Sequence, residues 1–280
     1  MSRSWVRIPL GAQIKKKRIS MIKNQCFIFL TTNGNSYERF QKIKSCNYPG
    51  IDFYYMIDIS SYNGEIPEGE NVITFNGDDV WNKWNGTIFY NKYGEYKSYC
   101  SNVHFIPIEF YLKNFGRKKE YDYYWYCEDD IFMPNGDYYE FFKQADKVKC
   151  DFLHMTPIFD GEDDNFTSRN VRLKTKGNTN LIYKLIPKPL WTKYNYWCWM
   201  QMFRITPVAC RLIKINFKSI HRAHGELCMP SIIKKNGLSC HCISESDEIN
   251  YNFVIQCLPL NPRILDEELA NTFYHPMKID

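Results

Sequence analysis

The sequence of 280 residues has no apolar run that would span a lipid bilayer, since a span needs about 20 consecutive apolar residues. The apolar run at residues 26–30 is too short for the core of a secretory signal, and polar residues follow it at once. The sequence also lacks the GxxxxGK run of Walker-type ATPases and the GxSxG run of α/β-hydrolases. These absences disfavour a membrane-spanning protein, a P-loop ATPase and a serine hydrolase.

A strong surplus of basic residues is also missing, because the formal net charge is only +5. The dense basic runs are short and lie at residues 15–18 and 117–119. A nucleic-acid-binding protein is expected to show a larger and patterned surplus, so we predict no nucleic-acid partner. The modest positive charge is compatible with an anionic substrate or with peripheral contact at a membrane surface.

The cysteines lack the paired CxxC spacing of zinc and redox sites. There are eleven of them, an odd number, scattered from Cys26 to Cys257. The tightest cluster is Cys240-His241-Cys242, where two side chains on one face of a strand do not form a closed zinc site. Several cysteines lie in apolar runs, where a free thiol behaves as a small hydrophobic group. We therefore predict a reducing, cytoplasmic environment.

The composition favours a folded chain, because 44% of the residues are hydrophobic and 17% are aromatic. Residues 1–20 resemble the peptide that results when a tRNA gene is translated by mistake, and Met21 precedes the first apolar run. We interpret residues 1–20 as a disordered or spurious extension. The fold is therefore expected in residues 21–280.

Apolar periodicity and turn residues predict alternating strands and helices over the rest of the chain. The expected strands lie at 26–30, 53–57, 72–75, 122–127, 151–155, 197–205 and 238–243. The expected helices lie at 37–45, 99–114, 138–145, 207–215 and 226–235, with Asp137 as the N-cap of the third. Residues 160–180 are polar and are expected to form a loop. This alternation predicts one Rossmann-like α/β domain with a mostly parallel sheet flanked by helices.

The strongest chemical feature is Glu128-Asp129-Asp130, which follows an apolar strand directly. Ligands of open α/β sheets bind beyond the carboxyl ends of the strands. Adjacent carboxylates repel one another, and a hard divalent cation supplies the opposing charge. The cluster therefore predicts a Mg²⁺ or Mn²⁺ site that holds a diphosphate, with a solvated acidic turn as the alternative.

The run from Tyr121 to Phe132, the turn at Gly136 and the aromatic helix with Phe141 and Phe142 resemble glycosyltransferases of the GT-A type. In that family a DxD-type motif ends a strand in this way, and here Glu128 stands at its first position. The resemblance extends from about Gln25 to Lys278. It implies a GT-A fold and transfer of a sugar, most readily from a UDP-sugar, to a glycan or lipid-linked acceptor in polysaccharide biosynthesis.

The resemblance also implies roles for individual residues. Glu128, Asp130 and the late His275 would bind the metal, and Glu226, opening a helix, would deprotonate the acceptor in an inverting enzyme. The residues that would contact the donor nucleotide or its phosphates are Thr31, Thr32, Asp58, Asp129 and Lys278. From the residues alone, His275 also fits a frayed terminal tail, and a helix dipole alone favours Glu226 in a first turn.

Two other functions stay open at the level of sequence. A nucleotidyltransferase acting on a sugar phosphate shares the sheet and the metal-bound phosphates, but it usually has a basic glycine-rich loop after the first strand. The loop after the first strand here, Thr31-Thr32-Asn33-Gly34, has no basic residue. A non-catalytic carbohydrate-binding module would keep the aromatic residues and bind neither metal nor nucleotide.

Overall fold

The computed structural model describes residues 24–31, 36–60, 62, 64–83, 88–91, 94–97, 103–114, 121–160, 196–217, 225–260 and 270–277. The expected extension at 1–20 and nearly all of the expected polar loop at 160–180 lie outside these ranges. Two of the predicted donor contacts, Thr32 and Lys278, also lie outside them. Among the described residues, no helix combines the length and the apolar character needed to cross a membrane.

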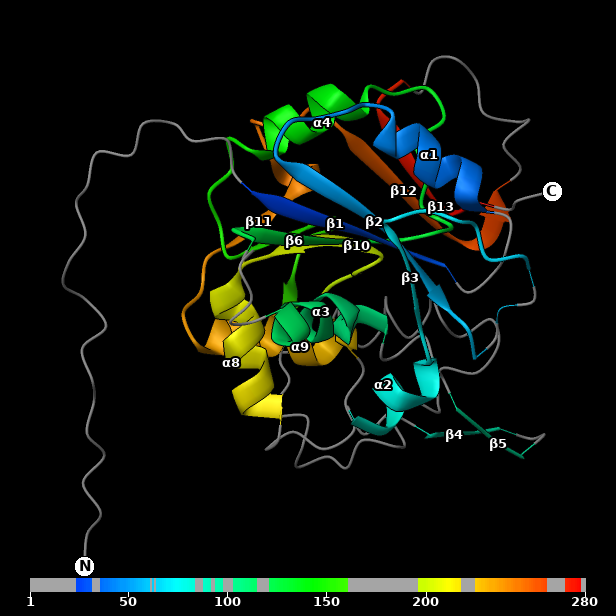
Figure 1. Ribbon diagram of the computed structural model, residues 1–280. Helices are drawn as coiled ribbons and strands as arrows, with labels where there is room; N and C mark the ends of the chain where they lie inside the picture. Colours follow the sequence, from blue (N-terminus) through cyan, green and yellow to red (C-terminus); the bar gives the residue numbers. More distant parts are fainter. Residues whose placement is uncertain are drawn as a thin grey trace, which may run out of the picture.

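A seven-stranded sheet in the order β11-β7-β10-β6-β1-β2-β3 forms the centre of the described fold (Figure 1). Its strands are β1 (Gln25–Thr31), β2 (Ile51–Asp58), β3 (Val72–Phe75), β6 (Tyr123–Glu128), β7 (Phe152–His154), β10 (Met202–Ile205) and β11 (Cys240–Cys242). Neighbouring strands run parallel, except that β10 is antiparallel to both β6 and β7. The prediction of a mostly parallel α/β sheet is confirmed. The strand expected over 197–205 is interrupted, and only its second half joins this sheet.

Three two-stranded sheets complete the described strands. They are β4 (Ile88–Asn91) with β5 (Gly94–Lys97), β8 (Phe159–Asp160) with β9 (Tyr196–Trp197), and β12 (Asn252–Leu260) with β13 (Thr272–Met277). The pair β12–β13 is parallel. The sequence analysis did not predict β12 or β13, and β13 holds the last of the described residues.

The helices cover both faces of the central sheet, with α1 and α4 on one side and α3, α8 and α9 on the other (Figure 1). The α-helices are α1 (Tyr37–Lys44), α2 (Gly77–Lys83), α3 (Ile106–Asn114), α4 (Tyr138–Ala145), α8 (Pro207–Phe217) and α9 (Gly225–Lys235), and the 3₁₀ turns are η3 (Val103–Phe105) and η4 (Ile243–Glu245). The predicted cap of α4 is confirmed, since Asp137 accepts a hydrogen bond of 3.1 Å from the backbone N–H of Glu140. The described part of the helix expected over 99–114 begins as η3 and continues as α3, with Pro107 in the first turn of α3, where no N–H is needed.

Alternating side chains of the strands divide the core into two layers. On β1, Phe27 and Phe29 pack with α1 and α4, whereas Ile28 and Leu30 pack with α3, α8 and α9. These side chains are almost fully buried. Strands covered on both faces are apolar at every position, which is why residues 26–30 form a continuous apolar run.

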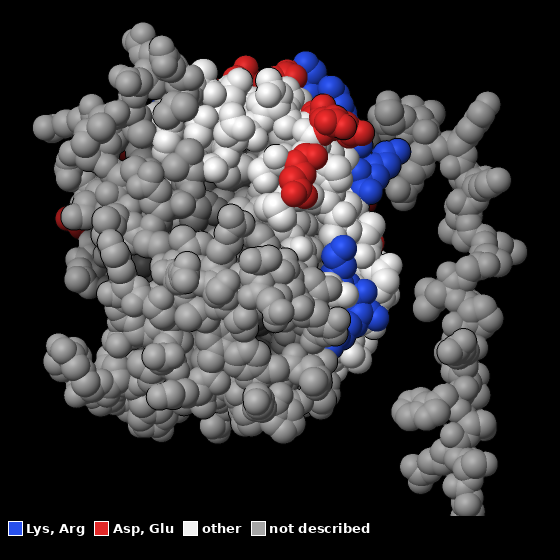
Figure 2. All heavy atoms as spheres, turned by 180° about the vertical axis from the view of Figure 1, so that it is seen from behind, with Lys and Arg blue, Asp and Glu red and all other residues white. Residues whose placement is uncertain are grey.

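The C-terminal strand β13 is attached to the loop that follows β6. The backbones of Phe132 and Tyr274 exchange two hydrogen bonds, of 3.2 and 3.0 Å. This pairing brings the last described residues of the chain to the carboxyl end of β6. On the face seen in Figure 2, the described part of the surface carries both acidic and basic side chains.

Candidate functional site

Strand β6 carries the acidic cluster to the carboxyl edge of the sheet. Its apolar residues are buried between the two helical layers, and Glu128 is its last residue. The backbone N–H of Glu128 donates to the carbonyl of Gln201, at 2.9 Å, which fixes the end of the strand. Asp129 and Asp130 follow in a turn, so the three carboxylates emerge together where the sheet ends.

His275 of β13 lies against this cluster. Its Nε2 atom is 3.3 Å from Oδ2 of Asp130 and 3.7 Å from Oε2 of Glu128. The exchange of hydrogen bonds between Phe132 and Tyr274 holds β13 in the register that places His275 here. The structure therefore brings together the three predicted metal ligands from two distant segments of the chain.

Glu128, Asp130 and His275 have the donor set and the spacing that fit a divalent cation. They form the one group of three such residues within the described ranges, and their ligand atoms lie within 4.8 Å of one another. Bonds of about 2.1 Å place opposite ligands of Mg²⁺ about 4 Å apart, so only a small closure is needed. Among the described residues, the buried Oδ1 atom of Asp130 has no hydrogen-bond partner. Such an atom is expected to have a ligand.

The charges of the cluster shift the protonation of its members. Burial, and then the nearby carboxylate of Asp130, raise the pKa of Glu128 well above its ordinary value. Burial alone would lower the pKa of His275, but the surrounding carboxylates, first that of Asp130, raise it. The site thus concentrates negative charge that a bound cation would neutralise.

The middle carboxylate, Asp129, points to a different partner. Its Oδ2 atom accepts a hydrogen bond of 2.5 Å from the Oγ1 atom of Thr31, at the end of β1. Its backbone carbonyl accepts from Nη1 of Arg39 on α1, at 3.1 Å. Two of the predicted donor-contacting residues, Thr31 and Asp129, therefore meet beside the predicted metal ligands.

Glu226 lies in the first turn of α9 and is only 3% exposed. Its Oε1 atom accepts a hydrogen bond of 3.1 Å from Nε2 of Gln201. Its charge contributes to the raised pKa of both Glu128 and His275, so the structure brings Glu226 to the same site. Its assignment as general base stays a prediction.

Asp58, another predicted donor contact, organises the backbone around the end of β2. It is 2% exposed, and its Oδ1 atom accepts from the backbone N–H groups of Ser60, at 2.9 Å, and Gly77, at 2.8 Å. Gly77 opens α2, and a Cβ atom there would lie 2.1 Å from Oδ2 of Asp58. The nucleotide contact of Asp58 stays a prediction.

Three residues near the cluster were not predicted from the sequence: His104, Tyr126 and Gln201. His104 is 2% exposed, and its Nε2 atom lies 3.5 Å from Oε1 of Glu128. The hydroxyl of Tyr126 donates to the same oxygen at 3.2 Å. These residues lie in apolar stretches of the sequence, and no local motif distinguishes them from core residues.

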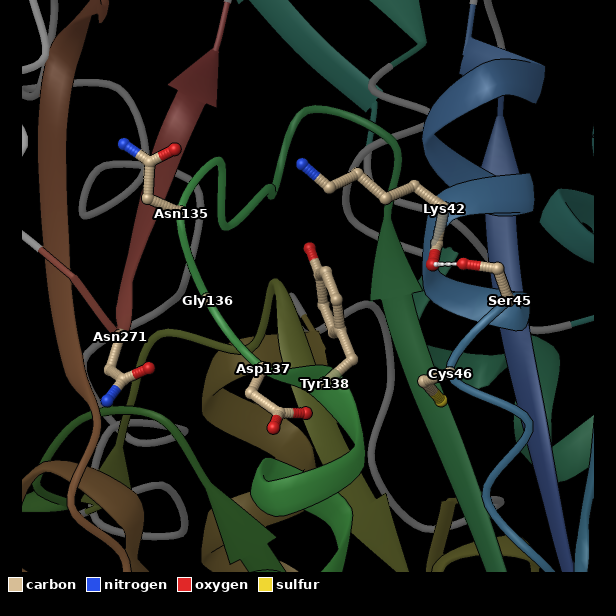
Figure 3. Close-up of a pocket in the computed structure, with 8 residues that line it drawn as sticks. All are labelled: Lys42, Ser45, Cys46, Asn135, Gly136, Asp137, Tyr138 and Asn271. Carbon is tan, nitrogen blue, oxygen red and sulfur yellow. Dashed lines mark hydrogen bonds between the residues drawn. The ribbon is translucent and has the colours of Figure 1, made fainter.

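A polar groove of about 510 Å³ lies farther along the loop that carries the acidic cluster (Figure 3). Residues of α1, of the loop before α4 and of the turn before β13 line it: Lys42, Ser45, Cys46, Asn135, Gly136, Asp137, Tyr138 and Asn271. The backbone N–H of Asn271 donates to the carbonyl of Asn135, at 3.3 Å, so the two asparagines lie on adjacent backbones. The groove combines amide, carboxylate, ammonium and hydroxyl groups.

No family model matches the sequence, and no curated protein matches it significantly. Among solved structures, the chain is similar to mouse xyloside xylosyltransferase 1, with 8% identity over 82% of this chain and 88% of that chain, at a TM-score of 0.38. It is similar to core-mannan synthase A of Aspergillus fumigatus in its Mn/GDP form, with 12% identity over 81% of this chain and 74% of that chain, at a TM-score of 0.40. It is also similar to the mannosyltransferase Ktr4p of S. cerevisiae in complex with GDP, with 15% identity over 88% of this chain and 80% of that chain, at a TM-score of 0.40.

Proposed function

We propose that this chain is a metal-dependent glycosyltransferase that uses a nucleoside-diphosphate sugar as donor, with UDP as the expected nucleotide. The observation that carries the proposal is the convergence of Glu128, Asp130 and His275 at the carboxyl edge of a mostly parallel sheet. Two carboxylates and one imidazole suit Mn²⁺, and Mg²⁺ is the alternative. When bound there, the cation would neutralise charge on the departing diphosphate.

The residues around the cluster would hold the donor in place. The hydrogen bond between Thr31 and Asp129 fixes the end of β1 against the end of β6, where we place the nucleotide. Asp58 is the last residue of β2, and Thr32 follows the neighbouring β1 in the sequence; both would contact the ribose or base. Lys278 lies three residues beyond His275 in the sequence and would contact a phosphate oxygen as a positive charge.

Glu226 would act on the acceptor if the enzyme inverts the anomeric configuration. A general base must come within hydrogen-bond distance of the hydroxyl that it deprotonates. Gln201 holds one oxygen of the Glu226 carboxylate. The position of Glu226 beside the proposed metal ligands supports a role for its carboxylate at the reacting centre.

The acceptor would be a glycan or a lipid-linked sugar, bound next to the metal. Sugar hydroxyls pair with groups that both donate and accept hydrogen bonds, and the polar groove offers the side-chain amides of Asn135 and Asn271 (Figure 3). The loop that lines the groove begins at the acidic cluster, so an extended acceptor would follow this loop. We propose no nucleic-acid partner and a cytoplasmic location, with peripheral contact at the membrane if the acceptor is lipid-linked.

A thermal-shift screen of nucleoside diphosphates, with and without Mn²⁺, tests the proposal. A ligand at about 100 times its Kd stabilises the folded state by about 2.7 kcal/mol. For a protein of this size, each kcal/mol raises the melting temperature by roughly 2 °C. We expect a shift of about 5 °C with UDP that requires Mn²⁺ and is lost in Asp130→Ala.

Asp122→Ala is the matched control, because Asp122 lies just before the opposite end of β6 and its carboxylate accepts from the backbone of Asn24. This variant should keep the full metal-dependent shift. A shift with nucleoside triphosphates and sugar phosphates, but none with diphosphates, would indicate a nucleotidyltransferase. No shift with any nucleotide at saturating Mn²⁺ would contradict the enzyme proposal and favour a carbohydrate-binding module.

A further inference from the structure

Glu128 lies between two imidazoles that belong to different parts of the fold. On the open side, Nε2 of His275 is 3.7 Å from Oε2 of Glu128. On the buried side, Nε2 of His104 is 3.5 Å from Oε1. His275 is 15% exposed and His104 is 2% exposed, so only His275 lies where a ligand from solvent would reach it.

The two oxygens of the Glu128 carboxylate therefore have different surroundings. Oε1 faces the fold, where the hydroxyl of Tyr126 donates to it at 3.2 Å. Nε2 of His104 lies 3.5 Å from the same oxygen, slightly farther than an ordinary hydrogen bond. Oε2 faces His275, which forms the predicted ligand set together with Glu128 and Asp130. A carboxylate held through one oxygen presents the other in a fixed direction.

The ring of His104 is fixed by its neighbours. It packs edge-on against Tyr126, with ring centroids 5.7 Å apart, and contacts Phe203 at 6.4 Å. The first residue of α9, Gly225, lies directly against the ring, because a Cβ atom there would lie 2.6 Å from Nδ1 of His104. The start of α9 thus needs a residue without a side chain beside His104. Glu226, the predicted general base, is the next residue of the helix.

We propose that His104 is a positioning residue for the metal site: with Tyr126, it holds Oε1 of Glu128 so that Oε2 is presented to the cation. This inference rests on the metal site of the proposed function. His104 would donate through Nε2–H in its neutral form, and it would touch neither metal nor substrate. Groups that hydrogen-bond a metal-ligating side chain contribute about 10- to 100-fold in metal affinity.

Mn²⁺ titrations of the whole chain at constant pH, followed by calorimetry or by the EPR signal of free Mn²⁺, test this role. His104→Phe keeps an aromatic ring against Tyr126 and Phe203 but removes the donor, and it should weaken Mn²⁺ binding by about 10- to 100-fold. His104→Gln places an amide N–H near the position of Nε2 and should stay within a few-fold of the wild type. Tyr126→Phe removes a single hydroxyl, so it tests the hold on Oε1 even if the His104 variants fold poorly.

The outcomes separate this inference from the proposed function. If the wild type binds Mn²⁺ and His104→Phe binds it equally well, His104 serves only packing and the inference is overturned. Equal losses in His104→Gln and His104→Phe would also overturn it, because they would show that the ring shape matters and the donor does not. If the wild type binds no Mn²⁺, the metal site itself fails, and the role of His104 fails with it.

Discussion

Nε2 of His275 lies 3.3 Å from Oδ2 of Asp130, although the two residues are far apart in the sequence. The contact depends on the backbone pairing of Phe132 with Tyr274, which lie two residues after Asp130 and one residue before His275. The imidazole is thus held by β13 and the carboxylate by the turn after β6. A metal site built from two independently anchored segments is formed only in the folded chain.

His275→Gln should weaken Mn²⁺ binding without unfolding the protein, because it removes one ligand and leaves the backbone pairing of Tyr274 intact. The loss should be at least about 10-fold, which is about 1.4 kcal/mol of binding free energy. His241→Gln is the matched control, since His241 lies on β11 at the far edge of the sheet from β3. If calorimetry gives equal Mn²⁺ affinities for the two variants, His275 is not a ligand of the metal.

Gly225→Ala should weaken Mn²⁺ binding although residue 225 is not a ligand. The added Cβ atom would lie 2.6 Å from Nδ1 of His104, so the imidazole must leave its present position beside Glu128. Gly69→Ala is the control, because the nearest atom to its added Cβ, on Val72, lies at an ordinary contact distance of 3.5 Å. We expect a loss of affinity of several-fold in the first variant and none in the second. An unchanged Mn²⁺ affinity in Gly225→Ala would show that the position of His104 does not matter.

His154 should make the protein less stable as the pH falls from 6.5 to 4. Burial lowers the pKa of His154 from 6.5 to about 4, so the unfolded chain binds more protons than the folded chain in this interval. The folded protein is not destabilised by this group above pH 6.5, and it loses stability as the pH falls toward 4. At about 1.4 kcal/mol per pKa unit, the free energy of unfolding should fall by about 3 kcal/mol.

Urea unfolding of the wild type and His154→Asn at pH 7 and pH 4 measures this effect. The wild type should lose about 3 kcal/mol more than the variant between the two pH values, because Asn does not titrate. Carboxylates that titrate in the same interval are common to both proteins, so the difference isolates His154. Parallel losses in the two proteins would mean that His154 is not held neutral in the folded state.

Arg204 should be a structural residue with no role in metal binding. It is 1% exposed, and its guanidinium donates to the carbonyls of Ala145, at 2.8 Å, and Val148, at 2.6 Å. Arg204→Met would leave both buried carbonyls without these donors, at a cost of about 2–4 kcal/mol in the free energy of unfolding.

Arg211→Met is the matched control for Arg204→Met. Arg211 is exposed on α8 and donates to the hydroxyl of Tyr111, so its loss should cost about 1 kcal/mol or less. Chemical denaturation and Mn²⁺ titration of both variants check the assignment. A changed Mn²⁺ affinity in Arg204→Met, in a protein that remains folded, would contradict a purely structural role.

Local features of the sequence predicted most of the central sheet. The continuous apolar runs of β1 and β6 identify strands buried on both faces, and Asp137 marks the start of α4. The same reasoning missed the antiparallel direction of β10, because periodicity does not specify strand direction. It also missed the pair β12–β13, which depends on contacts between distant segments.

The residues of the candidate site also fall into those that the sequence predicted and those that it did not. The acidic cluster was predicted from its place at the end of an apolar strand, β6, and His275 was predicted from the family resemblance. His104 has no signal in the sequence, since its role depends on the distance of its ring to Glu128 and on the lack of a side chain at Gly225. Asp58 was predicted to contact the nucleotide because it ends a strand, and this contact stays a prediction; the hydrogen bonds that its carboxylate accepts from its own loop and from the start of α2 have no signal in the sequence.

A crystal structure of the protein soaked in MnCl₂, with anomalous differences recorded, tests the central claim most directly. We predict one strong anomalous peak within bonding distance of carboxylate oxygens of Glu128 and Asp130 and of Nε2 of His275. An absent peak at saturating Mn²⁺, or a peak bound by other residues while these three stay apart, would contradict the account.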